Sequence, residues 1–232
     1  MHIAGLQKCS LIDFPGKLAA TVFTNGCNFR CPFCHNAQLL RGSPSRNQFS
    51  TTDIFKFLEK RKDLLDGVVI TGGEPTLQTD LLDFINTIKS MGFLVKLDTN
   101  GYRPHILKSV IQSGMVDYIA MDIKSGWRNY SDAAGININI EKIEQSIFLI
   151  KNSGVSHEFR STLMRPFLSP RDVLDIAAYL SGTEQYRLQK FLMPENFPER
   201  DLTYLIPFTK RELNKLQEQV DRIITKRFVI AA

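Results

Sequence analysis

The sequence predicts an α/β fold, a partial, open (β/α)6 barrel whose strands are mostly parallel. Runs rich in Val, Ile, Phe and Thr, as buried strands are, alternate with segments whose apolar residues recur at helical spacing. Such alternation implies parallel strands joined by right-handed crossovers. Six units are too few to close an eight-unit barrel. We expect residues 1–232 to form one domain, with an N-terminal extension at 1–17, a core at 18–193 and a C-terminal helix and tail at 194–232.

The expected strands are short runs followed by loops rich in Gly, Pro or Asn. They occupy residues 18–24, 68–71, 93–99, 116–123, 155–164 and 186–193. In parallel α/β barrels the chemistry lies on loops that follow the carboxyl ends of the strands. The loop after each strand is therefore where we expect functional residues.

Helical stripes lie between the strands, at residues 54–58, 81–88, 106–111, 140–150, 173–180 and 213–223. Their ends carry the usual start and stop signals. Helices are expected to start at Pro104, at Ser169-Pro170 and at a capping box of Thr209 with Glu212, and to stop at Gly114, Gly154 and Gly182.

The composition is that of an ordinary globular chain, with 43% hydrophobic and 23% charged residues. The longest run without Asp, Glu, Lys or Arg is residues 18–29, shorter than the ~20 residues of a membrane span. The N-terminus lacks the pattern of a signal peptide. The net charge is +5, but no basic run exceeds residues 60–62 and no aromatics interleave with it. We expect a soluble, cytoplasmic protein with no membrane or nucleic-acid partner.

Three of the four cysteines, Cys27, Cys31 and Cys34, form a C-x3-C-x2-C motif after the first strand. Close thiolates in a cytosolic chain indicate a metal rather than a disulfide, and soft thiolates select zinc or iron–sulfur clusters. A closed zinc site needs a fourth ligand, for which His35 or the distant Cys9 are the candidates. A cluster held by three cysteines leaves one iron open. The spacing favours the cluster, a zinc-binding module stays the alternative, and Cys9 is expected to be small and buried or half-buried.

The motif resembles the signature of the radical S-adenosylmethionine (SAM) superfamily, in which an aromatic residue, here Phe33, precedes the last cysteine. The resemblance implies one 4Fe-4S cluster, with Cys27, Cys31 and Cys34 as catalytic residues and metal ligands, and SAM as cofactor. Asn36 belongs to a Cys-His-Asn triplet that is found in activases of glycyl radical enzymes.

Further candidates follow the later strands. Gly72-Gly73-Glu74 alone is a weak turn signal, but it resembles the family's GGEP element, whose backbone and glutamate hold the amino group of SAM. Asn100-Gly101 could be a hairpin turn, yet a helix is expected next. Charged and polar residues also stand at strand ends, and a single one is usually solvated. Taken with the resemblance, the expected SAM-binding residues are Phe33, Asn36, Gly72, Gly73, Glu74, Asp98, Thr99, Asp122, Lys124 and Arg160, and Gln189 stands at the sixth strand.

The N-terminal part narrows the resemblance. SLIDFPGK at residues 10–17, followed by FTNGCNFRCPFCHN, is similar to the activating proteins of anaerobic ribonucleoside-triphosphate reductase. This implies cleavage of SAM with an electron from a flavodoxin or ferredoxin. The resulting 5′-deoxyadenosyl radical would take a Cα hydrogen from a glycine of the reductase.

The sequence departs in two places from the pattern of the pyruvate formate-lyase activases, and two other functions stay open as alternatives. Pyruvate formate-lyase activases have Gly where this chain has Phe14, and a histidine after the last strand, where residues 192–196 read LMPEN. No cysteine follows Cys34, so we expect no additional cluster. The alternatives are an activase of another glycyl radical enzyme, such as pyruvate formate-lyase, and a small-molecule radical SAM enzyme that resembles a deazapurine synthase.

Overall fold

A computed structural model describes residues 1–40, 49–192 and 204–225 of the chain. Its sheet follows chain order, β1-β2-β3-β4-β5-β6-β7, and the short β8 pairs with β6. Strands β2 to β7 are parallel, whereas β1 and β8 run antiparallel to their partners. The predicted open, mostly parallel sheet is therefore confirmed. The strands are β1 Ile3–Ser10, β2 Ala19–Thr24, β3 Gly67–Gly72, β4 Leu94–Thr99, β5 Tyr118–Asp122, β6 Ser156–Arg165, β7 Tyr186–Lys190 and β8 Ile206–Pro207.

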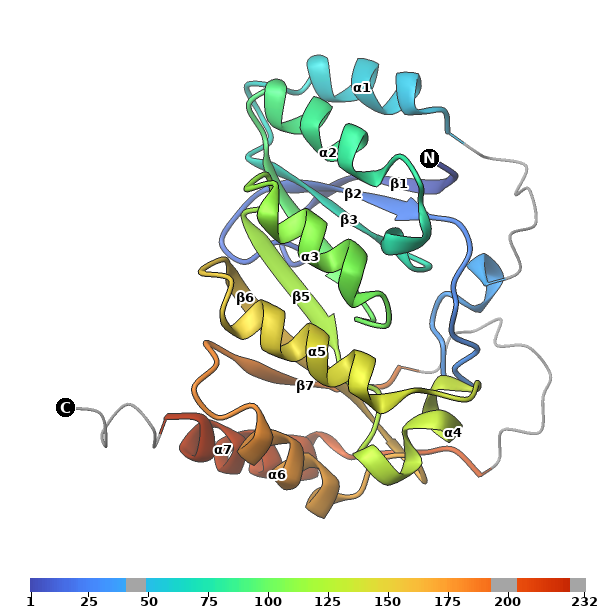
Figure 1. The fold of residues 1–232 in the computed structure, drawn as a ribbon, viewed down its shortest axis with the longest axis vertical. Coiled ribbons are helices and arrows are strands. Elements are labelled where there is room, and N and C mark those ends of the chain that lie inside the picture. The colour runs from blue at the N-terminus through green and yellow to red at the C-terminus, as the bar shows by residue number, and fades with distance from the viewer. Residues whose placement is uncertain (41–48, 193–203, 226–232) are drawn as a thin grey trace.

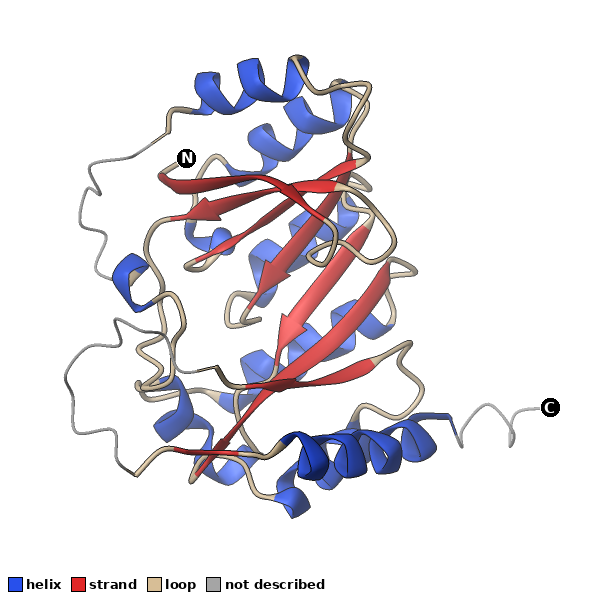
Figure 2. Cartoon of the chain, turned by 180° about the vertical axis from the view of Figure 1, so that it is seen from behind, coloured by secondary structure: helices blue, strands red, loops and turns tan. Residues whose placement is uncertain are grey.

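The helices lie mostly on one side of this sheet. Helices α2, α3, α5 and α6 lie in front of the strands in Figure 1, and the view from behind shows the other face of the strands largely uncovered (Figure 2). Helix α7 packs against β7 and α6. The helices are α1 Thr51–Glu59, α2 Leu81–Ser90, α3 Pro104–Gln112, α4 Tyr130–Ala134, α5 Ile140–Lys151, α6 Pro170–Tyr179 and α7 Lys210–Thr225. None of the helices in the described ranges has the length and apolarity that crossing a bilayer requires.

The predicted helix ends agree with the structure. Pro104 and Pro170 are the first residues of α3 and α6, and Ser169 forms a capping box with Asp172. Thr209 and Glu212 exchange the hydrogen bonds of a capping box at the start of α7. These side chains satisfy backbone N–H groups that have no partner inside the helix.

The apolar core lies between the helices and the sheet. Strand residues such as Ile70 and Ile119 and helix residues such as Ile85 and Ile147 are at most 1% exposed. Burial of each such side chain contributes about 1.5–3 kcal/mol to folding. The core therefore fixes the strands, and with them the positions of the loops at their carboxyl ends.

The N-terminal extension was expected to lie outside the strand–helix units, and it contains an additional strand. Strand β1 pairs antiparallel with β2, with Ile3 opposite Thr24 and Ser10 opposite Ala19. As an edge strand it leaves most of its side chains exposed or half-exposed, so it shows no clear apolar alternation. The short α4 and β8 were not predicted either, and Met193 of the predicted sixth strand lies outside the described residues.

The loop between β1 and β2 closes one end of the barrel. Phe14 is 4% exposed and packs with Ala19 and Val69, and its ring lies 6.0 Å from that of Tyr118. These residues belong to the amino-terminal parts of β2, β3 and β5, opposite the loops expected to carry the chemistry. We call residues 10–18, which hold this position, the floor loop.

Candidate active site

One cavity of about 350 Å³ gathers all of the predicted site residues at the carboxyl ends of the strands. Their roles stay predictions, but the structure brings them to one place. The predicted residues in its wall are Cys27, Cys31, Phe33, Cys34, Asn36, Gly72, Gly73, Glu74, Asp98, Thr99, Asp122, Lys124, Arg160 and Gln189.

The loop that carries the three cysteines, residues 25–36, is held by its own backbone. The amide of Arg30 donates to the carbonyl oxygen of Ala134 at the end of α4 (2.7 Å). The guanidinium of the same arginine donates to the carbonyl oxygen of Phe29 (2.7 Å). Phe33 is 4% exposed, and its ring lies 5.3 Å from that of Phe167. The loop is therefore anchored at two points between its cysteines, at Arg30 and at Phe33.

The glycine pair after β3 packs directly on this cysteine loop. The amide of Gly73 donates to the carbonyl oxygen of Thr24 (2.8 Å). Gly72 has a φ of 107°, which favours glycine. Asn36, at the end of the cysteine loop, donates its amide to the carbonyl oxygen of Gly72 (3.2 Å). The pair thus serves close backbone contact within the protein, and the ligand contact expected from the sequence stays a prediction.

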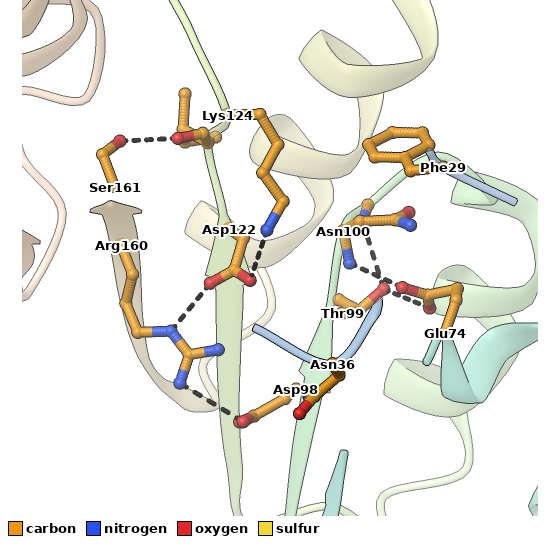
Figure 3. Close-up of polar contacts among 12 residues, drawn as sticks. Phe29, Asn36, Glu74, Asp98, Thr99, Asn100, Asp122, Lys124, Arg160 and Ser161 are labelled. Atoms are coloured by element: carbon orange, nitrogen blue, oxygen red, sulfur yellow. Dashed lines mark hydrogen bonds and ion pairs between the residues drawn. The ribbon is translucent and has the colours of Figure 1, made fainter. Parts of the chain in front are cut away.

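Glu74 joins two loops of the site (Figure 3). Its carboxylate is 1% exposed and accepts hydrogen bonds from the amide and hydroxyl of Thr76, from the hydroxyl of Thr99 and from the amide of Asn100, at 2.6–3.1 Å. Burial raises the pKa of Glu74, and these hydrogen bonds oppose the rise. The sequence predicted that this side chain holds SAM, whereas in the structure protein donors occupy both of its oxygens.

Charged side chains of alternating sign line the part of the cavity wall that is formed at β4, β5 and β6. Arg160 lies between two carboxylates: its Nη1 is 3.2 Å from Asp98 Oδ2 and its Nε is 2.9 Å from Asp122 Oδ1 (Figure 3). Lys124 Nζ lies 2.9 Å from the second oxygen of Asp122. Burial by itself would raise the pKa of Asp122, but Arg160 and Lys124 hold it well below its usual range. The two cations of this wall are balanced by two carboxylates, which hold them in place at the cavity.

The three thiols fit a metal cluster. Burial raises the pKa of Cys27 to about 12 and that of Cys31 to about 11, and it also raises the pKa of Cys34. Free thiols in this environment keep their protons at neutral pH, so ligation has to displace them. Lys124 lowers the pKa of all three thiols and so favours the thiolates. Soft thiolates around one cavity are the donor set of an iron–sulfur cluster, whose cysteines bind different irons.

His35 has other partners. Its Nε2 lies 3.0 Å from the carbonyl oxygen of Leu192, and its ring stacks on Phe191 at 4.7 Å. Among the residues that the structure describes, no three His, Cys, Asp or Glu side chains lie at the spacing of a single-ion site.

The prediction for Cys9 was wrong. Cys9 lies on the edge strand β1, and its side chain is exposed rather than buried or half-buried. It has no place in the wall of the cavity. The error arose because a free cysteine is usually buried, and the sequence did not show that residues 3–10 form an edge strand.

Several residues at or beside the cavity were missed by the sequence analysis. Asn100 was considered only as a turn residue, but its amide donates to Asn28 Oδ1 (2.7 Å) and lies 3.9 Å from Cys27 Sγ. Asp13 reaches the cavity from the floor loop. Lys96 is buried beneath Asp98, 2.9 Å from its carboxylate. Only Asn100 had a usable signal, because it stands at the end of a predicted strand.

Comparisons with known proteins agree with this geometry. Residues 21–181 match the family model described as Radical SAM superfamily. A protein of Methanocaldococcus jannaschii named "Putative glycyl-radical enzyme activating enzyme" is 30% identical over 236 residues, which cover 97% of this chain and 95% of that protein. The pyruvate formate-lyase-activating enzyme of Clostridium pasteurianum is 29% identical over 128 residues, 53% of this chain and 52% of that enzyme.

Solved structures share the fold at low sequence identity. A radical SAM methyltransferase from Sphaerobacter thermophilus has a TM-score of 0.70 at 15% identity, covering 90% of this chain and 65% of that one. SuiB of Streptococcus suis, solved with S-adenosylmethionine, has a TM-score of 0.69 at 16% identity, covering 87% of this chain and 46% of that one.

The fold, the cysteine motif and the family match define the class of protein: the chain belongs to the radical SAM superfamily. Its relation to the Methanocaldococcus protein, which extends over nearly the whole length of both, places it among the glycyl-radical enzyme activating enzymes. It is therefore an enzyme, and its family implies a 4Fe-4S cluster and SAM.

Proposed function

We propose that this enzyme generates a glycyl radical on anaerobic ribonucleoside-triphosphate reductase, using one 4Fe-4S cluster and SAM. The observation that carries the proposal is that three cysteine thiols and a row of alternating charges line the same cavity. The relative of the same length, named as a glycyl-radical activating enzyme, supports the reaction class. The SLIDFPGK stretch, which resembles the reductase activases, supports the reductase as target.

Each wall of the cavity has a role in the proposal. Cys27, Cys31 and Cys34 hold the cluster. With SAM bound to it, the cluster supplies the one-electron cleavage of SAM on which this superfamily depends. Lys124 and Arg160 attract the carboxylate of SAM, and their hydrogen bonds to Asp122 keep both cations at the wall.

The remaining residues shape and hold the SAM site. The carboxylate of Asp98 offers a polar partner for the ribose, and the buried Phe33 supplies an apolar wall for the adenine. Thr99 lines the same site, and its hydroxyl donates to Glu74 and so holds the two loops together. Asn36 and Glu74 tie the loops together, so that the cysteine loop and the strand ends keep their relative positions. Such fixed positions are what a reaction between bound groups requires.

A protein substrate suits the open sheet. Strands β1 and β7 form opposite edges of the sheet, so the barrel leaves a side through which a loop carrying a glycine can reach the cavity. We propose that the electron comes from a flavodoxin or ferredoxin and that the reaction takes place in the cytoplasm, where such donors are found.

Pyruvate formate-lyase is the second candidate target, because the Clostridium pasteurianum activating enzyme matches about half of this chain. Phe14 supports the reductase instead. It fills the floor of the barrel against Val69 and Tyr118, at a position where pyruvate formate-lyase activases have Gly.

The test is a reaction with both candidate substrates. The cluster is reconstituted without oxygen and reduced, and SAM is added with either anaerobic reductase or pyruvate formate-lyase, each containing α-deuterated glycine. We expect a glycyl radical signal in electron paramagnetic resonance and deuterium in 5′-deoxyadenosine with the reductase, and neither with Cys31→Ser. A signal with pyruvate formate-lyase alone would show that the proposed target is wrong.

The same preparation tests the remaining alternatives. If neither protein reacts and a purine-like small molecule stimulates SAM cleavage, the chain is a small-molecule enzyme. A colourless protein that retains zinc after reconstitution would contradict the cluster itself.

A further inference from the structure

We propose that Lys96 is a positioning residue that orients Asp98, and through it Arg160, toward SAM. The inference rests on the proposed SAM site, but none of the roles assigned above includes Lys96. It concerns the affinity for SAM, which can be measured whether or not a glycyl radical is formed.

Lys96 is an unusual residue for the middle of a parallel strand. Its side chain is 2% exposed, and its ammonium lies 2.9 Å from Asp98 Oδ1 and 3.9 Å from Glu158 Oε1. It also donates a hydrogen bond to the carbonyl oxygen of Asp13 in the floor loop (2.6 Å). Lysine is almost never fully buried without such partners. Because an apolar replacement of a buried ion pair is often neutral or stabilising, stability alone is a weak reason for a lysine here.

Lys96 is not one of the residues of the cavity wall, and its side chain is buried behind Asp98. It lies two residues before Asp98 on β4, so both side chains extend from the same face of the sheet. Asp98 is 14% exposed and does line the cavity. Any effect of Lys96 on a bound molecule therefore passes through its neighbours.

The two oxygens of Asp98 have different partners. Oδ1 of Asp98 faces the ammonium group of Lys96, and Oδ2 accepts a hydrogen bond from Nη1 of Arg160. The Nε of Arg160 donates to Asp122 instead. Arginine and carboxylate prefer a bidentate pair with two parallel hydrogen bonds. Without Lys96, Asp98 is free to turn both oxygens to Arg160 and to draw the guanidinium away from Asp122. Lys96 thus keeps Arg160 shared between two carboxylates.

Lys96 also connects this wall to the floor loop. The carbonyl oxygen of Asp13 is its second strong contact, and the carboxylate of Asp13 accepts a hydrogen bond from Thr21 (2.9 Å). Asp13 itself lines the cavity. The ammonium group of Lys96 therefore fixes Asp13 of the floor loop and Asp98 of the charged cavity wall relative to each other.

The test compares Lys96→Met with a charge-balanced variant and two controls. Lys96→Met removes one buried positive charge, and Lys96→Met/Glu158→Gln also removes a buried negative charge. Glu158 has two other cationic partners: Arg187, which is 51% exposed and remains solvated, and Nη1 of Arg160 at 3.9 Å, a contact that changes equally in both variants that carry Glu158→Gln. Glu158→Gln alone is the reference for the double variant. Lys89→Met is the control, because Lys89 pairs with Asp117 outside the cavity (2.8 Å).

Each protein is reconstituted, and its iron content, melting temperature and SAM dissociation constant are measured by iron assay, calorimetry and equilibrium dialysis. In Lys96→Met we expect full iron content and a SAM affinity lowered by on the order of tenfold. This is the effect of losing one charge-assisted hydrogen bond between Arg160 and SAM. In the double variant the melting temperature should return to that of Glu158→Gln while the affinity stays low. If Lys96→Met does not fold, the double variant carries the test by itself.

Three results would overturn the proposal. One is a wild-type affinity in Lys96→Met, and another is a double variant that binds SAM as well as Glu158→Gln does, which would mean that Lys96 only balances charge. The third is a loss of iron in both Lys96 variants, which would assign Lys96 to the cysteine loop. A wild-type protein that binds SAM but forms no glycyl radical would contradict the proposed function and leave the role of Lys96 intact.

Discussion

The backbone amide of Glu74 donates a hydrogen bond to the carbonyl oxygen of Gly26 across 2.8 Å, so the loop after β3 lies directly on the cysteine loop. A Cβ atom added at Gly73 would stand 2.0 Å from the same oxygen. Real Cβ atoms do not come so close to a backbone oxygen, and backbone cannot yield as a flexible side chain can. The glycine at this position is therefore required by the protein's own packing before any ligand binds.

Gly73→Ala should accordingly reduce cluster binding as well as SAM binding. The added methyl group has to displace the backbone beside Cys27, at a cost of about 1–3 kcal/mol for overpacking. Iron per chain after reconstitution and the melting temperature measure the effect. Gly5→Ala is the matched control, because its Cβ would meet only Phe23, at an ordinary 3.6 Å. A Gly73→Ala protein with full iron content and a wild-type melting temperature would contradict this explanation.

The cysteines make different contributions to cluster binding. Cys31→Ser should lose the cluster, since Cys31 lines the cavity, whereas Cys9→Ser should keep it, since Cys9 is exposed on β1. Iron content and the brown colour of the reconstituted protein distinguish the two. Loss of iron in Cys9→Ser would show that a fourth cysteine takes part.

The strand ends could be predicted from the sequence because local signals mark them. The run before Asp98 is rich in β-branched and apolar residues, and the polar residues that follow it stand where parallel strands deliver their chemistry. Lys96 could not be found in this way. Its burial depends on Asp13, which is 83 residues away in the sequence, and on Glu158 from another strand. A charge inside a strand has no local feature that tells whether it faces solvent or a partner from a distant segment.

Removal of Lys124 should have an effect on stability that depends on pH. Burial tends to raise the pKa of Asp122, but the charges of Arg160 and Lys124 outweigh it and hold the pKa below its ordinary value. A carboxyl group with a lowered pKa stabilises the fold above its unfolded pKa of about 3.9, and this contribution is lost as the pH falls through the lowered value. The difference in unfolding free energy between wild type and Lys124→Met should therefore be largest near neutral pH.

Urea denaturation of the cluster-free proteins at pH 7 and at pH 3 measures this difference. It should shrink at pH 3, where Asp122 in the variant starts to take up a proton. Lys89→Met serves as the control for loss of a lysine outside the cavity. A difference that stays equal at both pH values would show that the interaction of Lys124 with Asp122 does not contribute to stability.

The side chain of Gln217 on α7 covers the edge of β7. Removal of this side chain should promote self-association of the protein. Gln217 accepts a hydrogen bond from the amide of Leu188 (2.8 Å) and donates one to the carbonyl oxygen of Tyr186 (2.9 Å), as a neighbouring strand would. Gln217→Ala loses both bonds, which should cost about 1–3 kcal/mol of stability, and it leaves backbone groups of an edge strand open to a second chain. Sedimentation velocity should show more dimer than in the wild type or in the neighbouring control Glu218→Ala, whose side chain is exposed. A monomeric Gln217→Ala protein with unchanged stability would mean that packing of α7 alone protects this edge.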